Sequence, residues 1–313
     1  MSRRIDQDEL LRLIGDDGSF VSGEQLSRQL GVSRTAVWKQ ITAMRSAGFS
    51  IDALPSHGYR LVSSPEKICM NDISAGLPAG SLIGQQVVWL SETGSTNAEA
   101  FRLAEQGATE GTVVMADRQT AGKGRLGRQW VSPGGVNLYL SVILRPPLPP
   151  YEAPQLTFLS AVAVARAIED ETGLKPAIKW PNDLRLNGRK VAGLLNEMSA
   201  ETDRIGFVIL GIGLNLNMGA EQFPPDLRSP ATSLAIELDR PVSRKVVATR
   251  LLAALDDEYA RFGRSGFGPV RESWSKRCNA YGRQVMVDHG GVMLKGPFAG
   301  IDHDGALLLL FIR

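Results

Sequence analysis

Histidine and cysteine are scarce in this chain of 313 residues. Its three histidines are His57, His289 and His303, and none stands beside a serine or cysteine in a catalytic arrangement. Triad hydrolysis and histidine-rich metal sites are therefore poor expectations, and no metal-ligating residues are predicted. The two cysteines, Cys69 and Cys278, are far apart and lack metal-ligand spacing, so a reducing cytoplasm is the expected location.

Long apolar runs and a strong excess of one charge are also missing. The longest apolar run, residues 306–312, is far too short to span a bilayer, and the first residues lack the apolar core of a signal peptide. The 35 lysines and arginines nearly balance the 33 aspartates and glutamates, which gives a net charge of +2. Any contact with DNA is therefore expected to be local.

A small helical unit is predicted in the first sixty or so residues. Apolar residues between 10 and 14 form one helical face, and residues 22–25 have the form of a capping box that starts a second helix. A break at residues 31–33 leads into a third helix, predicted from Arg34 to about Ala47. This order of elements is typical of a helix-turn-helix.

The third predicted helix carries two contrasting faces. Val37, Ile41 and Met44 recur at the spacing of a buried helical face. Two short alternating segments, 49–52 and 57–61, follow the helix and predict a β-hairpin wing. A small helical domain for protein contacts is the alternative, but the side chains left exposed favour contact with the DNA major groove. They are Arg34, Thr35, Trp38 and Lys39.

Beyond a linker-like run from Ser63 to Lys67, strand and helix signals alternate. Several connections between strands are too short for crossover helices, so a sheet that is at least partly antiparallel is expected. This predicts a central α+β domain with a mixed sheet and helices. Strands are expected near residues 87–90, 112–116, 137–144, 178, 184, 191–195 and 207–212, and helices at 98–105, 154–172 and 244–264.

A third domain is predicted at the end of the chain. Short strands are expected at 284–287, 292–295, 300–302 and 306–312, and glycine-rich turns separate them as in a small β-barrel. The predicted domains are therefore a winged helix-turn-helix at 1–64, the central domain at 65–264 and the small barrel at 265–313.

A glycine loop with three cations, residues 119–130, lies between two predicted strands. Its small residues let the backbone approach an anion, while Lys123, Arg125 and Arg128 can supply charge-assisted hydrogen bonds. A dinucleotide fingerprint does not fit, because residues 131–135 stop any helix that begins at the glycines. A Walker loop does not fit, because Gly124 follows Lys123 where serine or threonine is required. An ordinary basic surface turn is the alternative to an anion site.

Four further polar clusters stand at the ends of predicted elements. Residues 95–99 open a helix, where Thr96 and Glu99 can form a capping box. Residues 179–183 combine a cation, an aromatic, an amide and a carboxylate at a proline turn, Lys190 begins an apolar strand, and residues 211–217 end one with two amides. Each cluster alone has a plain structural explanation. Together they specify many cations and amides without a nucleophile, as in nucleotidyl or phosphoryl transfer.

The order of these motifs resembles the biotin protein ligase family. With the winged helix in front, the chain is similar over nearly its whole length to the bifunctional form that also represses the biotin operon and ends in an SH3-like barrel. One departure is visible, since the family's loop commonly reads Gly-Arg-Gly-Arg and Lys123 replaces the first arginine here. The matching motifs are Ser95–Asn97, Gln119 with Gly122–Trp130, Lys179–Asp183, Lys190–Gly193 and Gly211–Asn217.

The resemblance implies an enzyme that uses biotin, ATP and Mg²⁺ to make biotinyl-5'-AMP and transfers biotin to a lysine of a biotin carboxyl carrier protein. It implies catalytic roles for Arg125, Lys190 and Asp183, with Asp183 orienting or deprotonating the incoming lysine. It also implies a homodimer that binds operator DNA when loaded with the adenylate. The implied biotin contacts are Ser95, Thr96, Asn97, Gln119, Lys123, Gly124, Arg125 and Lys190. The implied ATP contacts are Arg128, Trp130, Lys179, Asn182 and Asn215.

Two other functions stay open. A non-enzymatic regulator would only sense a nucleotide or another small acid, which leaves Asp183 without a role. An acyl-adenylating enzyme of the lipoate ligase kind would need neither the winged helix nor the C-terminal barrel. Release of pyrophosphate with biotin, compared with lipoate, separates these possibilities.

Overall fold

The computed structural model describes residues 6–15, 19–46, 49–63 and 70–310, and the chain divides into two compact units. Unit 1 comprises Met1–Lys67 with Pro133–Val136, and unit 2 comprises Ile68–Ser132 with Asn137–Arg313. Cys69, Ala47 and most of the predicted linker, residues 64–67, lie outside the described residues.

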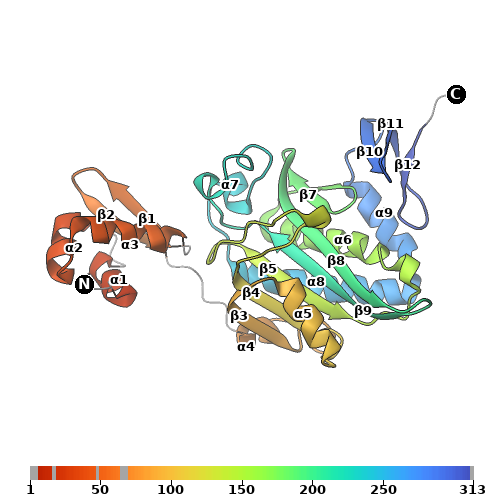
Figure 1. The fold of residues 1–313 in the computed structure, drawn as a ribbon, viewed down its shortest axis with the longest axis horizontal. Coiled ribbons are helices and arrows are strands. Elements are labelled where there is room, and N and C mark those ends of the chain that lie inside the picture. The colour runs from red at the N-terminus through yellow and green to blue at the C-terminus, as the bar shows by residue number, and fades with distance from the viewer. Residues whose placement is uncertain (1–5, 16–18, 47–48, 64–69, 311–313) are drawn as a thin grey trace. The chain divides into compact units, whose positions relative to one another are not determined.

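Unit 1 contains three helices and a β-hairpin (Figure 1). The Ser22 hydroxyl oxygen accepts a hydrogen bond from the Gln25 backbone N at 3.1 Å and so caps the second helix, and Gly31 ends that helix in the left-handed region at φ 66°. The predicted winged helix-turn-helix is thereby confirmed. The elements are α1 (Gln7–Ile14), α2 (Gly23–Leu30), α3 (Arg34–Ser46), β1 (Ser50–Leu54) and β2 (Gly58–Ser63).

The two faces of α3 are as predicted. Val37, Ile41 and Met44 are buried in one core with Leu26 and Ile51. The opposite face carries exposed side chains, among them the indole of Trp38, which is 56% exposed. The remaining predicted DNA contacts on this face, all exposed, are Arg34, Thr35 and Lys39.

Unit 2 is built on one seven-stranded sheet in the order β3-β4-β5-β9-β8-β7-β6. Only β3 and β4 pair in parallel, and the other pairs are antiparallel. The expected mixed sheet of an α+β domain is confirmed. The strands are β3 (Val87–Thr93), β4 (Val113–Gln119), β5 (Leu138–Leu144), β6 (Ala177–Lys179), β7 (Asp183–Leu186), β8 (Arg189–Ala200) and β9 (Ile205–Leu214).

Helices cover the two faces of this sheet unequally (Figure 1). The short α5 (Thr96–Glu105) packs its small residues Ala100 and Ala104 on one face. The long α6 (Gln155–Thr172) and α8 (Arg244–Ser265) contribute to the larger core on the other face, because both present long apolar stripes. Three helices had no counterpart in the sequence expectations, namely α4 (Met70–Ala75), α7 (Leu234–Leu238) and α9 (Phe267–Arg277).

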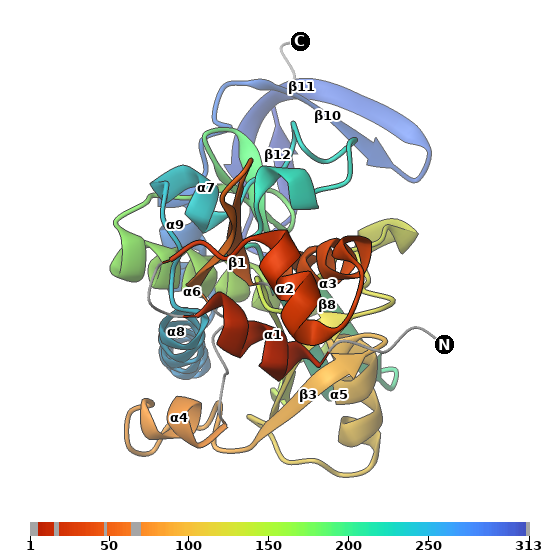
Figure 2. The ribbon, with the colours of Figure 1, turned by 90° about the vertical axis from the view of Figure 1, so that its left-hand side faces the viewer.

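A small antiparallel sheet in the order β10-β11-β12 ends the described chain (Figure 2). Its strands are β10 (Gln284–His289), β11 (Val292–Ile301) and β12 (Leu307–Leu309), so two of the predicted strands are one continuous strand. Phe298 of β11 and Trp274 of α9 belong to the main core of unit 2. A small C-terminal β structure is confirmed, and closure into a barrel is not seen within residues 284–309.

Within the described ranges, no helix combines the length and the apolar character that a bilayer crossing requires.

Candidate active site

Small residues on three adjacent strands make a hollow in the face of the sheet that α5 covers. Gly193 of β8 lies opposite Gly213 of β9, and Gly211 lies between Leu195 and Ser141 in the next row. A side chain at Gly213 would place its Cβ 2.5 Å from the Trp130 ring, and one at Gly211 would place it 2.1 Å from Asn97 Oδ1. Only glycine leaves this space for other groups. The pocket in the hollow has a volume of about 50 Å³.

The cationic loop folds back on itself at the mouth of this pocket. Trp130 N donates to Gly122 O at 2.9 Å, and Gly124 N donates to Arg128 O at 2.6 Å. Leu126, at the turn, has a φ of 59° and is largely exposed. The Trp130 indole lies over the glycines with Lys190 Nζ 5.2 Å from its ring centre, and its buried Nε1 has no hydrogen-bond partner in the described structure.

A directed chain of hydrogen bonds joins α5 to the base of the loop. Thr96 donates to Gln119 Oε1 from its backbone N at 2.8 Å and from its hydroxyl at 3.2 Å. Gln119 Nε2 donates to Ser132 Oγ at 2.9 Å, and the Ser132 hydroxyl donates to Trp130 O at 2.9 Å. The predicted capping box of Thr96 with Glu99 is wrong, because Thr96 is the first helical residue, its side chain faces Gln119, and Glu99 pairs with Arg102.

The same polar cluster continues on the other side of Thr96 through residues that the sequence reasoning missed. The fully buried Ser141 hydroxyl donates to Asn97 Oδ1 at 2.6 Å and lies 2.9 Å from Thr96 Oγ1. Asn97 Nδ2 donates to Glu197 Oε2 at 2.7 Å and to Leu195 O at 3.0 Å. Ser141 could have been noticed as the one small polar residue in the aliphatic and aromatic run of β5.

Paired and unpaired cations surround the pocket. Lys190 Nζ lies 2.6 Å from Asp183 Oδ1, and Lys123 Nζ lies 4.0 Å from Glu197 Oε1. Within the described residues, Arg125, Arg128 and Lys179 have no ion-pair partner. Arg125 lines the pocket, whereas Arg128 and Lys179, two of the predicted ATP contacts, do not. Such a cluster makes a strong anion site because charge-assisted contacts to phosphate or carboxylate are the strong ones.

Burial lowers the pKa of Lys179, and the nearby Arg185 lowers it further. Lys190 and Arg128 act in the same direction, while Asp183 opposes them. The group is therefore held in a positive field that a bound anion would relieve.

Most of the predicted site residues do come together. A groove of about 340 Å³ adjoins the pocket and shares Arg125, Asn182, Leu194 and Leu195 with it. Asp183 reaches the pocket through its ion pair with Lys190. The predicted residues that line the pocket are Ser95, Thr96, Asn97, Gln119, Lys123, Gly124, Arg125, Trp130, Asn182 and Lys190.

Asn215 is not brought to this pocket. It is buried, and its Nδ2 donates to Thr232 O at 3.0 Å while Asn137 Nδ2 lies 3.4 Å from its Oδ1. Its amide thus holds the segment before α7 against the end of β9, which is the ordinary structural use of a buried asparagine.

Unit 1 has its own concave surface. A cavity of about 670 Å³ lies between the start of α3 and the hairpin. Arg34, Thr35 and Trp38 line it from the helix, and residues 53–56 line it from the hairpin. Lys39 is exposed on the same helix but is not part of this lining. A helix with an adjacent hairpin in this arrangement suits insertion into a DNA groove.

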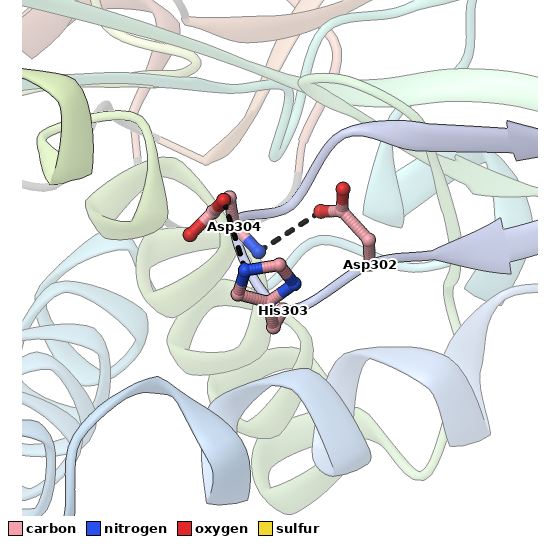
Figure 3. Close-up of side chains that lie close together, drawn as sticks. All are labelled: Asp302, His303 and Asp304. Carbon is pink, nitrogen blue, oxygen red and sulfur yellow. Dashed lines mark hydrogen bonds and ion pairs between the residues drawn. The ribbon is translucent and has the colours of Figure 1, made fainter.

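The described residues bring one group of potential metal ligands together, away from the pocket. Asp302, His303 and Asp304 lie at the turn between β11 and β12 (Figure 3). Asp302 Oδ1 accepts hydrogen bonds from the backbone N of Asp304 and of Ala306, both at 2.9 Å, so its role is to hold the turn.

Comparison with known proteins finds matches for both units of the chain. Residues 89–215 match the biotin/lipoate A/B protein ligase family, and residues 7–60 match an HTH domain. The chain is 40% identical over 302 residues to the bifunctional ligase/repressor BirA of Bacillus spizizenii, covering 96% of this chain and 93% of that protein. It is 34% identical over 304 residues to the bifunctional ligase/repressor BirA of Escherichia coli, covering 96% and 91%.

A solved structure of the same kind of enzyme also matches the chain. The biotin protein ligase from Aquifex aeolicus in complex with biotin and ATP matches with a TM-score of 0.64 at 31% identity. The match covers 72% of this chain and 92% of that one.

The buried polar cluster predicts unequal costs for two fully buried serines. Ser141→Ala removes the donor to Asn97 and should lower the free energy of unfolding by about 1–3 kcal/mol, the cost of an unsatisfied buried group. Ser160→Ala in α6 should cost much less, because its hydroxyl only adds a second bond to the Leu156 carbonyl. Urea unfolding of both variants measures the difference, and equal costs would contradict the importance assigned to the cluster.

Proposed function

This chain belongs to the biotin/lipoate protein ligase family and shares the organisation of its bifunctional ligase/repressor members, and from that membership we propose how its residues act. It is an ATP-dependent biotin protein ligase that forms biotinyl-5'-AMP and transfers biotin to a lysine of a carboxyl carrier protein, and it is a biotin-responsive transcriptional repressor. One observation carries the chemistry. Lys123, Arg125 and Lys190 line a pocket that also contains glycines and polar amides, whereas no cysteine or histidine lines it and its one serine, Ser95, has no histidine among the lining residues to act as a base.

Biotin would occupy the hollow on the α5 face. Its ring would meet the polar cluster of Ser95, Thr96, Asn97 and Gln119. Thr96 is hydrogen-bonded to Gln119, and the Asn97 amide is held by Ser141, Glu197 and Leu195. Its carboxylate would lie towards the backbone of Gly124 and the cations Lys123 and Lys190. This direction follows from charge, because the ring end of the pocket has amides, hydroxyls and the nearby Glu197 carboxylate, whereas the loop end carries the cations.

ATP would bind across the adjoining groove. Trp130, Asn182 and the groove walls would hold the nucleoside, and Arg125, Arg128 and Lys179 would neutralise the phosphates. A carboxylate oxygen of biotin attacks the α-phosphorus, the new oxygen–phosphorus bond forms, and the bond to the pyrophosphate oxygen breaks. Positive groups stabilise this transfer because negative charge builds on the transferred and leaving oxygens. Asn215 would act from the end of β9 by holding the segment before α7, and not by touching the nucleotide.

The second step forms an amide. The carrier lysine nitrogen attacks the acyl carbon, AMP leaves, and the amine gives up a proton. Asp183 is the proposed acceptor of that proton or the group that orients the amine. Its ion pair with Lys190 would fix its position beside the acyl group.

Mg²⁺ would enter with the nucleotide. Asp183 is the only carboxylate among the predicted ATP and catalytic residues, and it is occupied by Lys190. Phosphate oxygens and water would therefore supply most of its ligands, which is how Mg²⁺ is usually held with nucleotides. It would neutralise charge on the phosphates.

The ligase activity is tested by incubating the purified protein with biotin, ATP, Mg²⁺ and a carrier domain of proven competence. The domain should become labelled with biotin, and pyrophosphate should be released with biotin but not with lipoate. No label on a proven acceptor would overturn the proposal, and release with lipoate alone would favour the lipoate ligase alternative.

Arg125 gives a sharper test of the anion site. Arg125→Gly removes an unpaired guanidinium, and losing one charged hydrogen bond costs about 1.5–3 kcal/mol. The adenylate should escape roughly ten- to a hundredfold faster and acylate lysines of bystander proteins. The matched control is Arg118→Gly, because Arg118 is also exposed but pairs with Glu92 at 2.8 Å. Equal retention of the adenylate by wild type and Arg125→Gly would show that the role is wrong.

Repression would depend on dimerisation. A single winged helix on a chain of net charge +2 binds DNA weakly, so specific affinity would come from two copies on two half-sites. We propose that the adenylate favours the homodimer and thereby increases operator binding.

The α3 surface supplies the corresponding DNA test. Replacing Arg34 and Lys39 together by alanine should weaken operator binding and reduce the salt slope by about two, since each cation neutralises one DNA phosphate. Biotin transfer should be unchanged. Arg28→Ala is the control, because Arg28 is an exposed cation of α2 paired with Glu24. Gel shifts over a salt series measure the slopes.

The coupling between adenylate and operator binding is tested by gel shifts of the wild-type protein. Equal operator retention with and without biotin plus ATP would contradict the coupling.

A further inference from the structure

We infer that Glu197 is a positioning residue that fixes the orientation of the Asn97 amide. The pocket thereby selects a ligand that carries an N–H group. Glu197 lies on β8 opposite Ile209 and faces the same side of the sheet as the pocket glycines. None of the roles assigned above uses it. The inference rests on the proposed function, because it takes the ureido ring of biotin as that ligand.

The contacts of Asn97 leave one orientation of its amide. Both of its Nδ2 protons are used, one by Glu197 Oε2 at 2.7 Å and one by Leu195 O at 3.0 Å. Its Oδ1 accepts from the Ser141 hydroxyl at 2.6 Å. An amide oxygen has two acceptor positions, so one remains for a group that enters the pocket.

Reversal of this amide would be costly. Its oxygen would then face a carboxylate and a carbonyl, neither of which can donate. Ser141 does not add to this cost, because its hydroxyl can turn to donate to Thr96 Oγ1, 2.9 Å away, and accept from the reversed NH₂ group. Asn97 is only 4% exposed, so water has little access to the reversed groups. Glu197 supplies the stronger of the two restraints, because hydrogen bonds to charged groups are the stronger ones.

A fixed acceptor in the pocket has a consequence for specificity. The ureido ring of biotin offers two N–H donors, whereas the dithiolane ring of lipoate offers none. A site built to bond a substrate N–H rejects an analogue that lacks it, because the buried acceptor is left without a partner. Glu197 would thus favour biotin over lipoate by orienting Asn97, without contacting the ligand itself.

The ion pair of Glu197 with Lys123 does not account for such a role. Its atoms are 4.0 Å apart, and the two side chains are 34% and 53% exposed. Pairs of this kind contribute little. Substitutions can nevertheless separate the hydrogen bond of the carboxylate to Asn97 from its ion pair with Lys123.

Glu197→Met keeps the length of the side chain but removes the acceptor, whereas Glu197→Gln keeps an acceptor oxygen and loses the charge. If Glu197 fixes the orientation of the Asn97 amide, Glu197→Met should raise the KM for biotin roughly tenfold. This factor corresponds to the low end of the free energy of one charged hydrogen bond. Glu197→Gln should stay within about threefold of wild type, and the KM for ATP should change less than about twofold in both variants.

Pyrophosphate release measures each KM, with Glu201→Met as the control. Glu201 is exposed beyond the end of β8 and pairs only with Arg204 among the described residues. Titration calorimetry of biotin without ATP gives the affinity per folded site, so partial misfolding lowers the number of sites and not the affinity. Wild type that fails to activate biotin would overturn the proposed function itself.

Three results would overturn the role of Glu197 while leaving the ligase proposal intact. In the first, Glu197→Met binds biotin as wild type does. In the second, the KM values for biotin and ATP rise in parallel, which indicates general loosening. In the third, Glu197→Gln is as damaging as Glu197→Met, which would assign the effect to the charge and to Lys123.

Discussion

Positive charge that carboxylates balance only in part, beside a hollow lined by glycines and polar groups, is the constraint on which the site depends. Arg125, Arg128 and Lys179 have no carboxylate partner among the described residues, and the pKa of Lys179 is lowered first by burial and then by the nearby Arg185. Elsewhere in unit 2, cations such as Arg166 and Arg277 are paired with carboxylates at 2.6–2.7 Å. The protein therefore keeps unbalanced charge where a charged ligand restores the balance, as functional sites often do.

The hollow beside these charges depends on backbone geometry as much as on side chains. Gly193 and Gly213 face each other across β8 and β9, so two antiparallel strands supply a smooth floor for the Trp130 ring. The polar cluster then closes one end of the hollow with groups that satisfy one another. This division places specificity on the sheet and α5, which are rigid elements, and leaves charge neutralisation to the loop.

Much of this arrangement could be predicted from the sequence. The motifs at 95–97, 119–130 and 179–190 were recognisable because each lies at the end of an element and combines unusual residues. Ser141 was missed because it is a single polar residue in a mainly apolar strand, and Glu197 because it stands in a polar stretch near the end of β8. Their importance comes from register with Gly211 and Ile209, which no local pattern reveals. The capping box at Thr96 failed for a related reason, since a distant glutamine took the place of a local partner. Asn215 shows the reverse, because the amide of this motif residue is hydrogen-bonded to Thr232 O and does not line the pocket.

The hydrogen bonds that close the glycine loop bear on its conformational entropy. With Trp130 bonded to Gly122 and Gly124 bonded to Arg128, the residues between them are already restrained before any ligand arrives. Ordering one free residue costs about 1–2 kcal/mol, so a loop of this length left unrestrained would consume much of the free energy of binding. Since the loop is tied to itself, and its start is bonded to Thr93 and Gly94, few of its dihedral angles remain to be fixed when a ligand binds.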